Sequence, residues 1–263
     1  MQLILETHCP RYLTGYIDSI ACYTFSRNHC VTFCPEGAFK LVFLDSDQFQ
    51  YQVQCGKWES CSKKFVWGPH NMYHQLKSKK DKGVCVIVNF KPGKAKYFIP
   101  GKLDKYQNRL IDIGSVWNKR NEEEIIVALE SPNARNVEAF LLNRLLYRKK
   151  SLIDNAMESI VSNKGVVEIN YLAKSIKLSS SHFRKRFKEE VGISPSQFCK
   201  IYRTQSIMTF LKEESSISLT ELTYKFGYFD QSHFIREFKS VVGISPGQFK
   251  KKKELIKRPA YYE

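Results

Sequence analysis

The sequence lacks any apolar run long enough to cross a membrane as a helix. Such a span needs about 20 apolar residues in succession, and no stretch of the 263-residue chain approaches this length. Near the first residue, Glu6, His8 and Arg11 interrupt the apolar residues before the core of a signal peptide can form. We therefore expect no membrane partner, and the cytoplasm is the expected compartment.

The 8 cysteines show none of the Cys-x-x-Cys spacing that zinc sites and thioredoxin-like sites use. The sequence also has no His-x-His followed by a carboxylate, the arrangement that a cupin-type metal enzyme needs. His29, Cys30 and Cys34 form one candidate cluster, and His70 and His74 have no Asp or Glu close by in the sequence. We therefore predict no metal and no cofactor, and free thiols in a reducing compartment.

Signatures of catalysis are missing as well. The chain has no nucleophile–base pair, no phosphate-cradling glycine loop and no paired carboxylates at a useful spacing. We predict that the protein is not an enzyme.

Acidic residues are few relative to basic ones. The chain has 26 Asp and Glu against 42 Lys and Arg, a net charge of +16 and a pI near 9.4. This excess favours a polyanionic partner such as nucleic acid. Residues 1–149 and 150–263 each carry +8, so net charge does not identify the half that would bind it.

One stretch of the C-terminal part occurs twice, with a constant shift of 51 residues. The matching positions are Ser181-His182-Phe183 and Ser232-His233-Phe234, Phe187-Lys188 and Phe238-Lys239, Val191-Gly192-Ile193-Ser194-Pro195 and Val242-Gly243-Ile244-Ser245-Pro246, and Gln197-Phe198 and Gln248-Phe249. A solenoid needs at least three units to bury a continuous core. We therefore interpret the repeat as two copies of one supersecondary unit.

The unit has the pattern of a helix-turn-helix. Apolar residues at helical spacing between Ile169 and Ile176 predict a short helix, and Phe183, Phe187 and Val191 predict a second helix after a tight turn. The positions between these phenylalanines are basic, so the outer face of the second helix suits the major groove of DNA. In the second copy, the turn has a glycine and the next helix an Asp that can cap it.

These residues resemble the AraC/XylS family of bacterial transcription regulators. The run from Gly227 to Lys239, followed by Gly243-Ile244-Ser245-Pro246 and Phe249-Lys250, is similar to the family signature almost position for position. The resemblance implies a seven-helix DNA-binding domain whose two helix-turn-helix units are joined by a long helix at roughly 195–214. It also implies a sequence-specific transcription regulator, an activator, that reads two successive major-groove segments.

The resemblance also assigns the DNA contacts. The residues it implies are Ser181, Arg184 and Lys185 in the first recognition helix, Gln231, His233 and Arg236 in the second, and Lys188 and Lys239 toward phosphate. The alternative is that the arginines are solvated surface charges and that Ser181 and His233 serve as helix caps. Arg186 departs from the family pattern, which usually has an apolar residue there.

The N-terminal half predicts a different architecture. Phe49, Tyr51 and Val53 alternate with glutamines, and 39–44 and 84–90 are continuously apolar. These runs, with turn signals between them, predict an all-β sandwich or barrel. Helices are expected at 122–129 and 136–147, with a charged hinge after the second, at 148–150. The fold class is thus α+β: a cupin-like β-barrel with helices in domain 1–149, then an all-α domain in 150–263.

The N-terminal half resembles the sensor region of one branch of the same family, through Pro35-Glu36-Gly37, Gly68-Pro69 and Phe90-Lys91-Pro92-Gly93. The resemblance implies effector binding, dimerisation, or both. The expected partners are double-stranded DNA, and by resemblance RNA polymerase, a small-molecule effector and a second copy of the chain. An alternative makes the protein primarily a small-molecule or redox sensor with secondary DNA binding, because seven of the eight cysteines and many aromatics lie in this half.

Overall fold

The computed structural model describes residues 3–8, 11–53, 56–117, 134–146, 149–214 and 216–252. The predicted helix at 122–129 lies outside the described residues, as do Cys9, Cys55 and Arg148 of the predicted hinge. No helix within the described ranges is long and apolar enough to cross a membrane.

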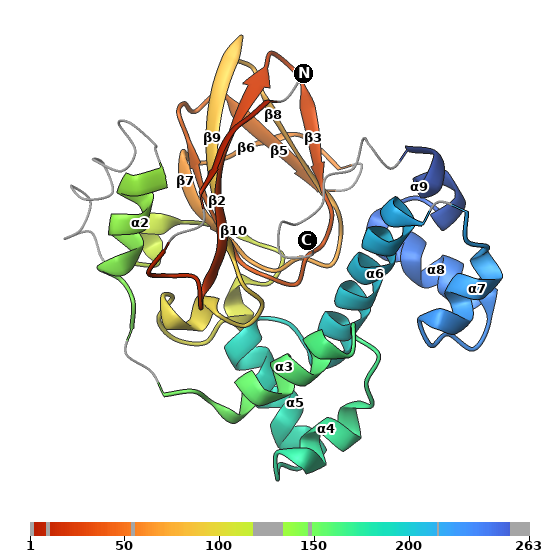
Figure 1. Cartoon of the computed structure of the whole chain (residues 1–263). Helices are drawn as coiled ribbons and strands as arrows, with labels where there is room; N and C mark the ends of the chain where they lie inside the picture. Colours follow the sequence, from red (N-terminus) through yellow and green to blue (C-terminus); the bar gives the residue numbers. More distant parts are fainter. Residues whose placement is uncertain are drawn as a thin grey trace.

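The N-terminal part is rich in β-strands, as predicted, and its strands form two antiparallel sheets (Figure 1). The order in the first sheet is β1-β2-β9-β4-β7-β10, and the order in the second is β3-β8-β5-β6. The strands are β1 (Leu3–His8), β2 (Ile17–Ser26), β3 (Cys30–Phe33), β4 (Lys40–Leu44), β5 (Phe49–Val53), β6 (Glu59–Ser60), β7 (Lys64–Trp67), β8 (His74–Ser78), β9 (Lys82–Phe90) and β10 (Leu110–Asp112). Between the described strands, hydrogen bonds do not close the two sheets into one ring, so the predicted barrel is an open, cupin-like arrangement.

The central strands are covered on both faces, which explains their continuous apolar runs. Every residue of β4 is buried. Because side chains alternate along a strand, Leu41 and Phe43 join one hydrophobic cluster, while Val42 and Leu44 join a second cluster with residues of the four-stranded sheet. The first cluster continues into the short helices that follow the sheet and into α2 (Ala134–Leu142). The short helices are η1 (Ala95–Tyr97), η2 (Asp104–Tyr106) and η3 (Ile113–Ser115).

The helix predicted at 136–147 ends earlier than expected. The structure ends α2 at Leu142, and Arg144 is buried beyond it, where its Nη1 donates to the backbone oxygen of Phe140 at 3.1 Å. Leu145, which follows it, is exposed. The predicted end was wrong because the Leu146 N–H donates to the Tyr97 oxygen at 2.6 Å instead of continuing the helix, and apolar periodicity does not register a bond to so distant a residue.

The C-terminal part is helical, with its two helix-turn-helix units at opposite ends of a long helix (Figure 1). Its helices are α3 (Leu152–Ser162), α4 (Ile169–Ser175), α5 (Ser180–Val191), α6 (Pro195–Glu213), α7 (Leu219–Lys225), α8 (Gln231–Val242) and α9 (Pro246–Lys252). The long helix α6 contributes Phe198 to the core of the first unit, and Ile207 and Met208 to the core of the second. This confirms the predicted pair of units and the connecting helix.

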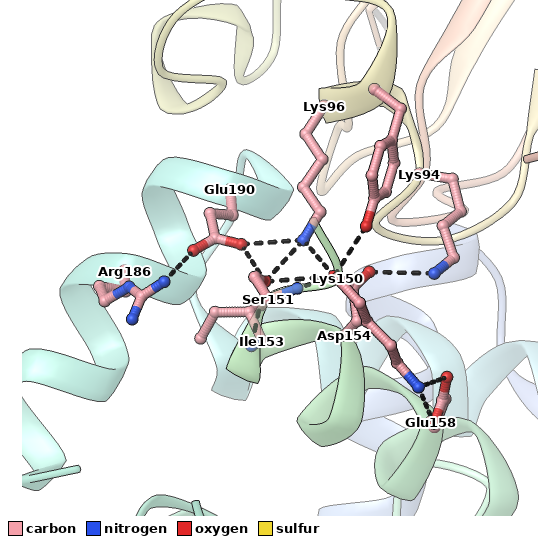
Figure 2. A network of polar contacts seen from close by, with 10 residues as sticks. Lys94, Lys96, Lys150, Ser151, Ile153, Asp154, Glu158, Arg186 and Glu190 are labelled. Carbon is pink, nitrogen blue, oxygen red and sulfur yellow. Dashed lines mark hydrogen bonds and ion pairs between the residues drawn. The ribbon is translucent and has the colours of Figure 1, made fainter. Parts of the chain in front are cut away.

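A buried ionic network joins the β-rich part to the helical part (Figure 2). Lys96 of η1 places its Nζ 2.8 Å from Asp154 Oδ2 of α3 and 2.8 Å from Glu190 Oε2 of α5. Lys94 pairs with the other oxygen of Asp154 at 2.9 Å. The same carboxylate accepts from the backbone N–H of Ser151 at 2.9 Å, closing the capping box at the start of α3.

Asp154 is ionised in this setting. Burial alone raises the pKa of its carboxyl group, but hydrogen bonds from Lys96, the Ser151 N–H and Lys94 outweigh burial, and the pKa lies well below its ordinary value. Since the folded pKa is the lower one, the carboxylate stabilises the fold at pH values above its unfolded pKa of about 3.9. This contribution is lost as the pH falls toward the folded pKa.

We expect Asp154→Asn to lower the free energy of unfolding by about 3 kcal/mol at pH 7, because removing one member of a buried ion pair leaves charge uncompensated. Urea denaturation measures this change. Asp81→Asn is the control, since Asp81 pairs at 3.5 Å with Arg27 and both side chains are exposed. The difference between wild type and Asp154→Asn should shrink below pH 4. Equal stability at pH 7 would contradict this role of the network.

Candidate nucleic-acid interface

The first unit orders its second helix through a cap and three buried side chains. Ser179 caps α5, its side chain accepting from the His182 N–H at 3.3 Å. Phe183, Phe187 and Val191 are buried on one face of α5, and burying them fixes which residues face outward. The exposed residues of α5 are Ser181, His182, Arg184, Lys185 and Lys188.

The second unit repeats this construction. Asp230 caps α8, its Oδ1 accepting from the His233 N–H at 2.7 Å. Phe234 and Phe238 are buried in the equivalent positions. The exposed residues of α8 include Gln231, Ser232, His233, Arg236 and Lys239.

The turns of the two units also share one hydrogen-bond pattern. In the first, the Leu178 N–H donates to the Ala173 oxygen at 2.9 Å, and in the second the Tyr228 N–H donates to the Thr223 oxygen at 3.0 Å. Gly227 takes a positive φ of 70° in the second turn, and Lys177 takes 57° at the equivalent place in the first. The second turn is longer by one residue, Phe229, which is 92% exposed.

All eight residues that the sequence singled out for DNA lie on exposed faces of α5 and α8. Within α8, Arg236 Nε donates to the Ser232 oxygen at 3.3 Å, and His233 Nε2 lies 3.9 Å from Glu237 Oε2. Neither Ser181 nor His233 supplies the side chain that caps its helix. Ser179 and Asp230 are the capping residues, so capping does not explain Ser181 or His233.

Arg186, where the chain departs from the family pattern, is only partly exposed and pairs within α5. Its Nη2 is 2.9 Å from Glu190 Oε1, within the network of Figure 2. The neighbouring residue Glu189 makes two contacts with the β-rich part. Its backbone oxygen accepts from the Leu103 N–H at 2.7 Å, and its carboxylate oxygen Oε1 lies 2.8 Å from Lys102 Nζ. The last turns of α5 therefore rest on the β-rich part, while the first turns project outward.

Three exposed aromatic residues near these helices escaped the sequence analysis. Phe229 stands before α8, and Tyr171 and Tyr224 lie on the first helices of the units, 68% and 71% exposed. Their spacing gave no sign of exposure, because an aromatic residue at helical spacing is usually part of a core.

In the β-rich part, His70 and His74 lie side by side with ring centroids 4.2 Å apart, one in a loop and one on β8. Burial lowers the pKa of both, that of His74 to about 4, so both are neutral at pH 7. No group of three His, Cys, Asp or Glu side chains within the described ranges is arranged to hold a metal ion.

Most described thiols are unsuited to redox sensing. Burial raises the pKa of Cys34, Cys61 and Cys199 to about 12, and it also raises the pKa of Cys85 well above its ordinary value. Cys30 is exposed, yet partial burial of its thiol raises its pKa as well. A reactive sensor cysteine needs a lowered pKa and access to solvent, and none of these five combines both.

Comparison with known families agrees with this geometry. Residues 172–252 match the family model described as a helix-turn-helix domain, and residues 6–112 match a domain of unknown function (DUF6597). The chain carries an AraC/XylS-type helix-turn-helix domain. The first match spans the AraC/XylS-type domain from α4 to α9, both units included.

Individual relatives resemble part of the chain. An uncharacterized HTH-type transcriptional regulator of Haemophilus influenzae is 32% identical over 32% of this chain and 28% of its own length. The HTH-type transcriptional activator RhaS of Escherichia coli is 23% identical over 44% of this chain and 45% of its own length. The chain therefore spans less than half the length of these curated relatives. The solved structure of ToxT from Vibrio cholerae, 12% identical, has a TM-score of 0.49 over 88% of this chain and 97% of that chain.

We expect Cys30 to react fastest with a thiol reagent at pH 7.5 among the described cysteines, since it is the exposed one. Cys34, Cys85 and Cys199 are buried and should react only as fast as the protein opens. Mass spectrometry of timed alkylation separates these rates, and Cys30→Ser identifies the fast phase. Rapid alkylation of a buried thiol in the native protein would contradict the assignment.

Proposed function

We propose that the protein is a sequence-specific DNA-binding transcription regulator that inserts α5 and α8 into successive major-groove segments. The observation that carries this proposal is the equivalence of the two units. Each presents polar and basic side chains at the start of its second helix and buries the phenylalanines of the opposite face. Two such helices at opposite ends of α6 suit one face of a duplex (Figure 1).

The dimensions support the same reading. Helix α6 has 19 residues and is therefore about 28 Å long. Successive major-groove segments on one face lie about 34 Å apart. The helix that separates the units is thus comparable in length with one turn of DNA.

In this proposal, the contacts divide by position along each helix. Ser181, Arg184 and Lys185 of α5, and Gln231, His233 and Arg236 of α8, reach base edges. Lys188 and Lys239, one turn further along, pair with phosphates, which fixes the register without reading sequence.

The chain would divide into an effector-binding or dimerisation domain at 1–149 and the DNA-binding domain at 150–263. Activation is the proposed outcome, and RhaS, one of the relatives, is named an activator. RNA polymerase, a small-molecule effector and a second copy of the chain are the further proposed partners. A primarily redox-sensing role is less favoured. Every shifted thiol pKa among the described cysteines is raised, whereas a reactive sensor cysteine needs a lowered one.

Selection of bound sequences from a random DNA pool tests the proposal directly. We expect full-length protein to enrich a site with two short blocks about ten base pairs apart, one for each recognition helix. Tandem copies of the site would indicate a dimer. Enrichment of no sequence, with binding that follows salt concentration alone, would contradict sequence-specific recognition.

We expect Arg236→Ala to weaken binding to the selected site by about 1–3 kcal/mol, the range for one base-reading side chain, with little change on random DNA. Fluorescence anisotropy with both duplexes at fixed salt measures the two losses. Arg27→Ala is the matched control, because Arg27 is an exposed arginine of the β-rich part. An equal loss on both duplexes would make Arg236 a phosphate contact instead.

A further inference from the structure

One loop of the β-rich part, Gly68–Tyr73, contacts both recognition helices at equivalent positions. Gly192 ends α5 and Gly243 ends α8, each in the left-handed conformation and 51 residues apart. A Cβ placed on Gly192 would lie 2.9 Å from Pro69 Cγ, and one on Gly243 would lie 2.6 Å from Tyr73 Cε1. Two side chains of the loop, four residues apart in the sequence, therefore press on the same point of the two units.

The loop is held firmly by its own domain. The Gly68 N–H donates to the Arg109 oxygen at 3.1 Å, and the Asn108 N–H donates to the Pro69 oxygen at 3.0 Å. The Asn71 N–H donates to Asn108 Oδ1 at 3.1 Å. Gly68 also lies so close to the next segment that a Cβ there would be 1.9 Å from the Tyr106 oxygen. The loop thus moves with the β-rich part.

Between its two contacts, the loop passes over α6. A cleft of about 320 Å³ lies beneath it, lined by Asn71 and Met72 of the loop, Gln197, Lys200 and Ile201 of α6, and Ser240 and Val241 of α8. The loop therefore lies across the long helix and reaches from one unit to the other. The two units are held by α6 and, in addition, by this loop.

We propose that the Gly68–Tyr73 loop sets the distance and rotation between the two recognition helices, so that the β-rich part specifies which spacing between two DNA blocks the protein accepts. Pro69 and Tyr73 are positioning residues in this proposal, and neither touches DNA. The inference rests on the proposed function. It goes further by assigning one element of DNA specificity to a part of the chain outside the helix-turn-helix domain.

The physical reason is geometric. Each base pair added between two blocks moves the second block by about 3.4 Å and turns it by about 34° around the duplex. A pair of helices fixed to each other cannot follow this movement and loses contacts at one block. A pair without the loop contact is restrained less, since the second unit then meets the β-rich part mainly through Cys34 in its hydrophobic core and can turn more easily.

The experiment compares affinities of full-length protein for the selected site and for the same site with one base pair added to, or removed from, its spacer. For wild type, the shifted spacers should weaken binding about tenfold or more, as poorly matched contact positions do. For Tyr73→Ala, the ratio of the affinity for the selected site to that for a shifted site should fall to about threefold or less. Without the loop contact, the two recognition helices can adjust to the shifted spacing and lose fewer contacts with DNA. Tyr73→Phe keeps the ring atoms that meet Gly243, so it should restore the wild-type ratio.

Two further variants complete the design. Tyr12→Ala is the matched control, since Tyr12 is a 74% exposed tyrosine of the same part, and it should keep the wild-type ratio. Pro69→Ala loosens the contact on the first unit, which provides a second test should Tyr73→Ala fail to fold.

The outcomes separate this inference from the function on which it rests. Wild type that binds its selected site but tolerates all spacers, or loop variants that keep the wild-type ratio, would overturn the loop's role and leave DNA recognition intact. Wild type that selects no site would instead overturn the proposed function, and the inference with it.

Discussion

The arrangement of the molecule depends on one buried cation, the ammonium group of Lys96. It compensates Asp154 at the start of α3 and Glu190 near the end of α5, each at 2.8 Å. Separating the β-rich part from the helical part would take both lysines from Asp154, whereas Glu190 would keep only Arg186 of its own helix. The same carboxylate of Asp154 completes the capping box of α3. One carboxylate therefore both attaches the helical part to the β-rich part and caps its first helix.

This constraint treats the two units unequally. The first unit is held to the β-rich part by ion pairs, in which Glu189 and Glu190 of α5 pair with Lys102 and Lys96. The second meets the β-rich part through packing, with Tyr73 against Gly243 and Cys34 inside its hydrophobic core. Apolar packing lacks the directional demand of a hydrogen-bonded charge. The contact of the β-rich part with the second unit is therefore less directional than its contact with the first.

The sequence analysis predicted the helix-turn-helix units, which depend on local patterns, and missed the ion pairs between residues far apart in the chain. The period of 51 residues and the apolar spacing located both units, because burial of Phe183 and Phe234 is decided within a few turns of helix. The pairing of Lys96 with Glu190, 94 residues apart, leaves no trace in local spacing. The ion pair of Arg186 with Glu190 is local, since the two residues are four apart on α5. The sequence analysis recorded only that Arg186 departs from a family pattern and did not consider this pair. Local patterns therefore located the candidate interface, and docking of the two parts determines how its helices are held.

Docking also explains how an evenly distributed charge becomes a localised surface. Each half carries +8, so composition favours neither. At the contact between the two parts, acidic side chains of α3 and α5 form ion pairs with lysines of the β-rich part. Arg184 and Lys188 on the outer face of α5 form no ion pair within the described ranges. The acidic residues that would neutralise this face are turned inward, so the positive potential needed to attract a phosphate backbone arises where the first recognition helix is exposed.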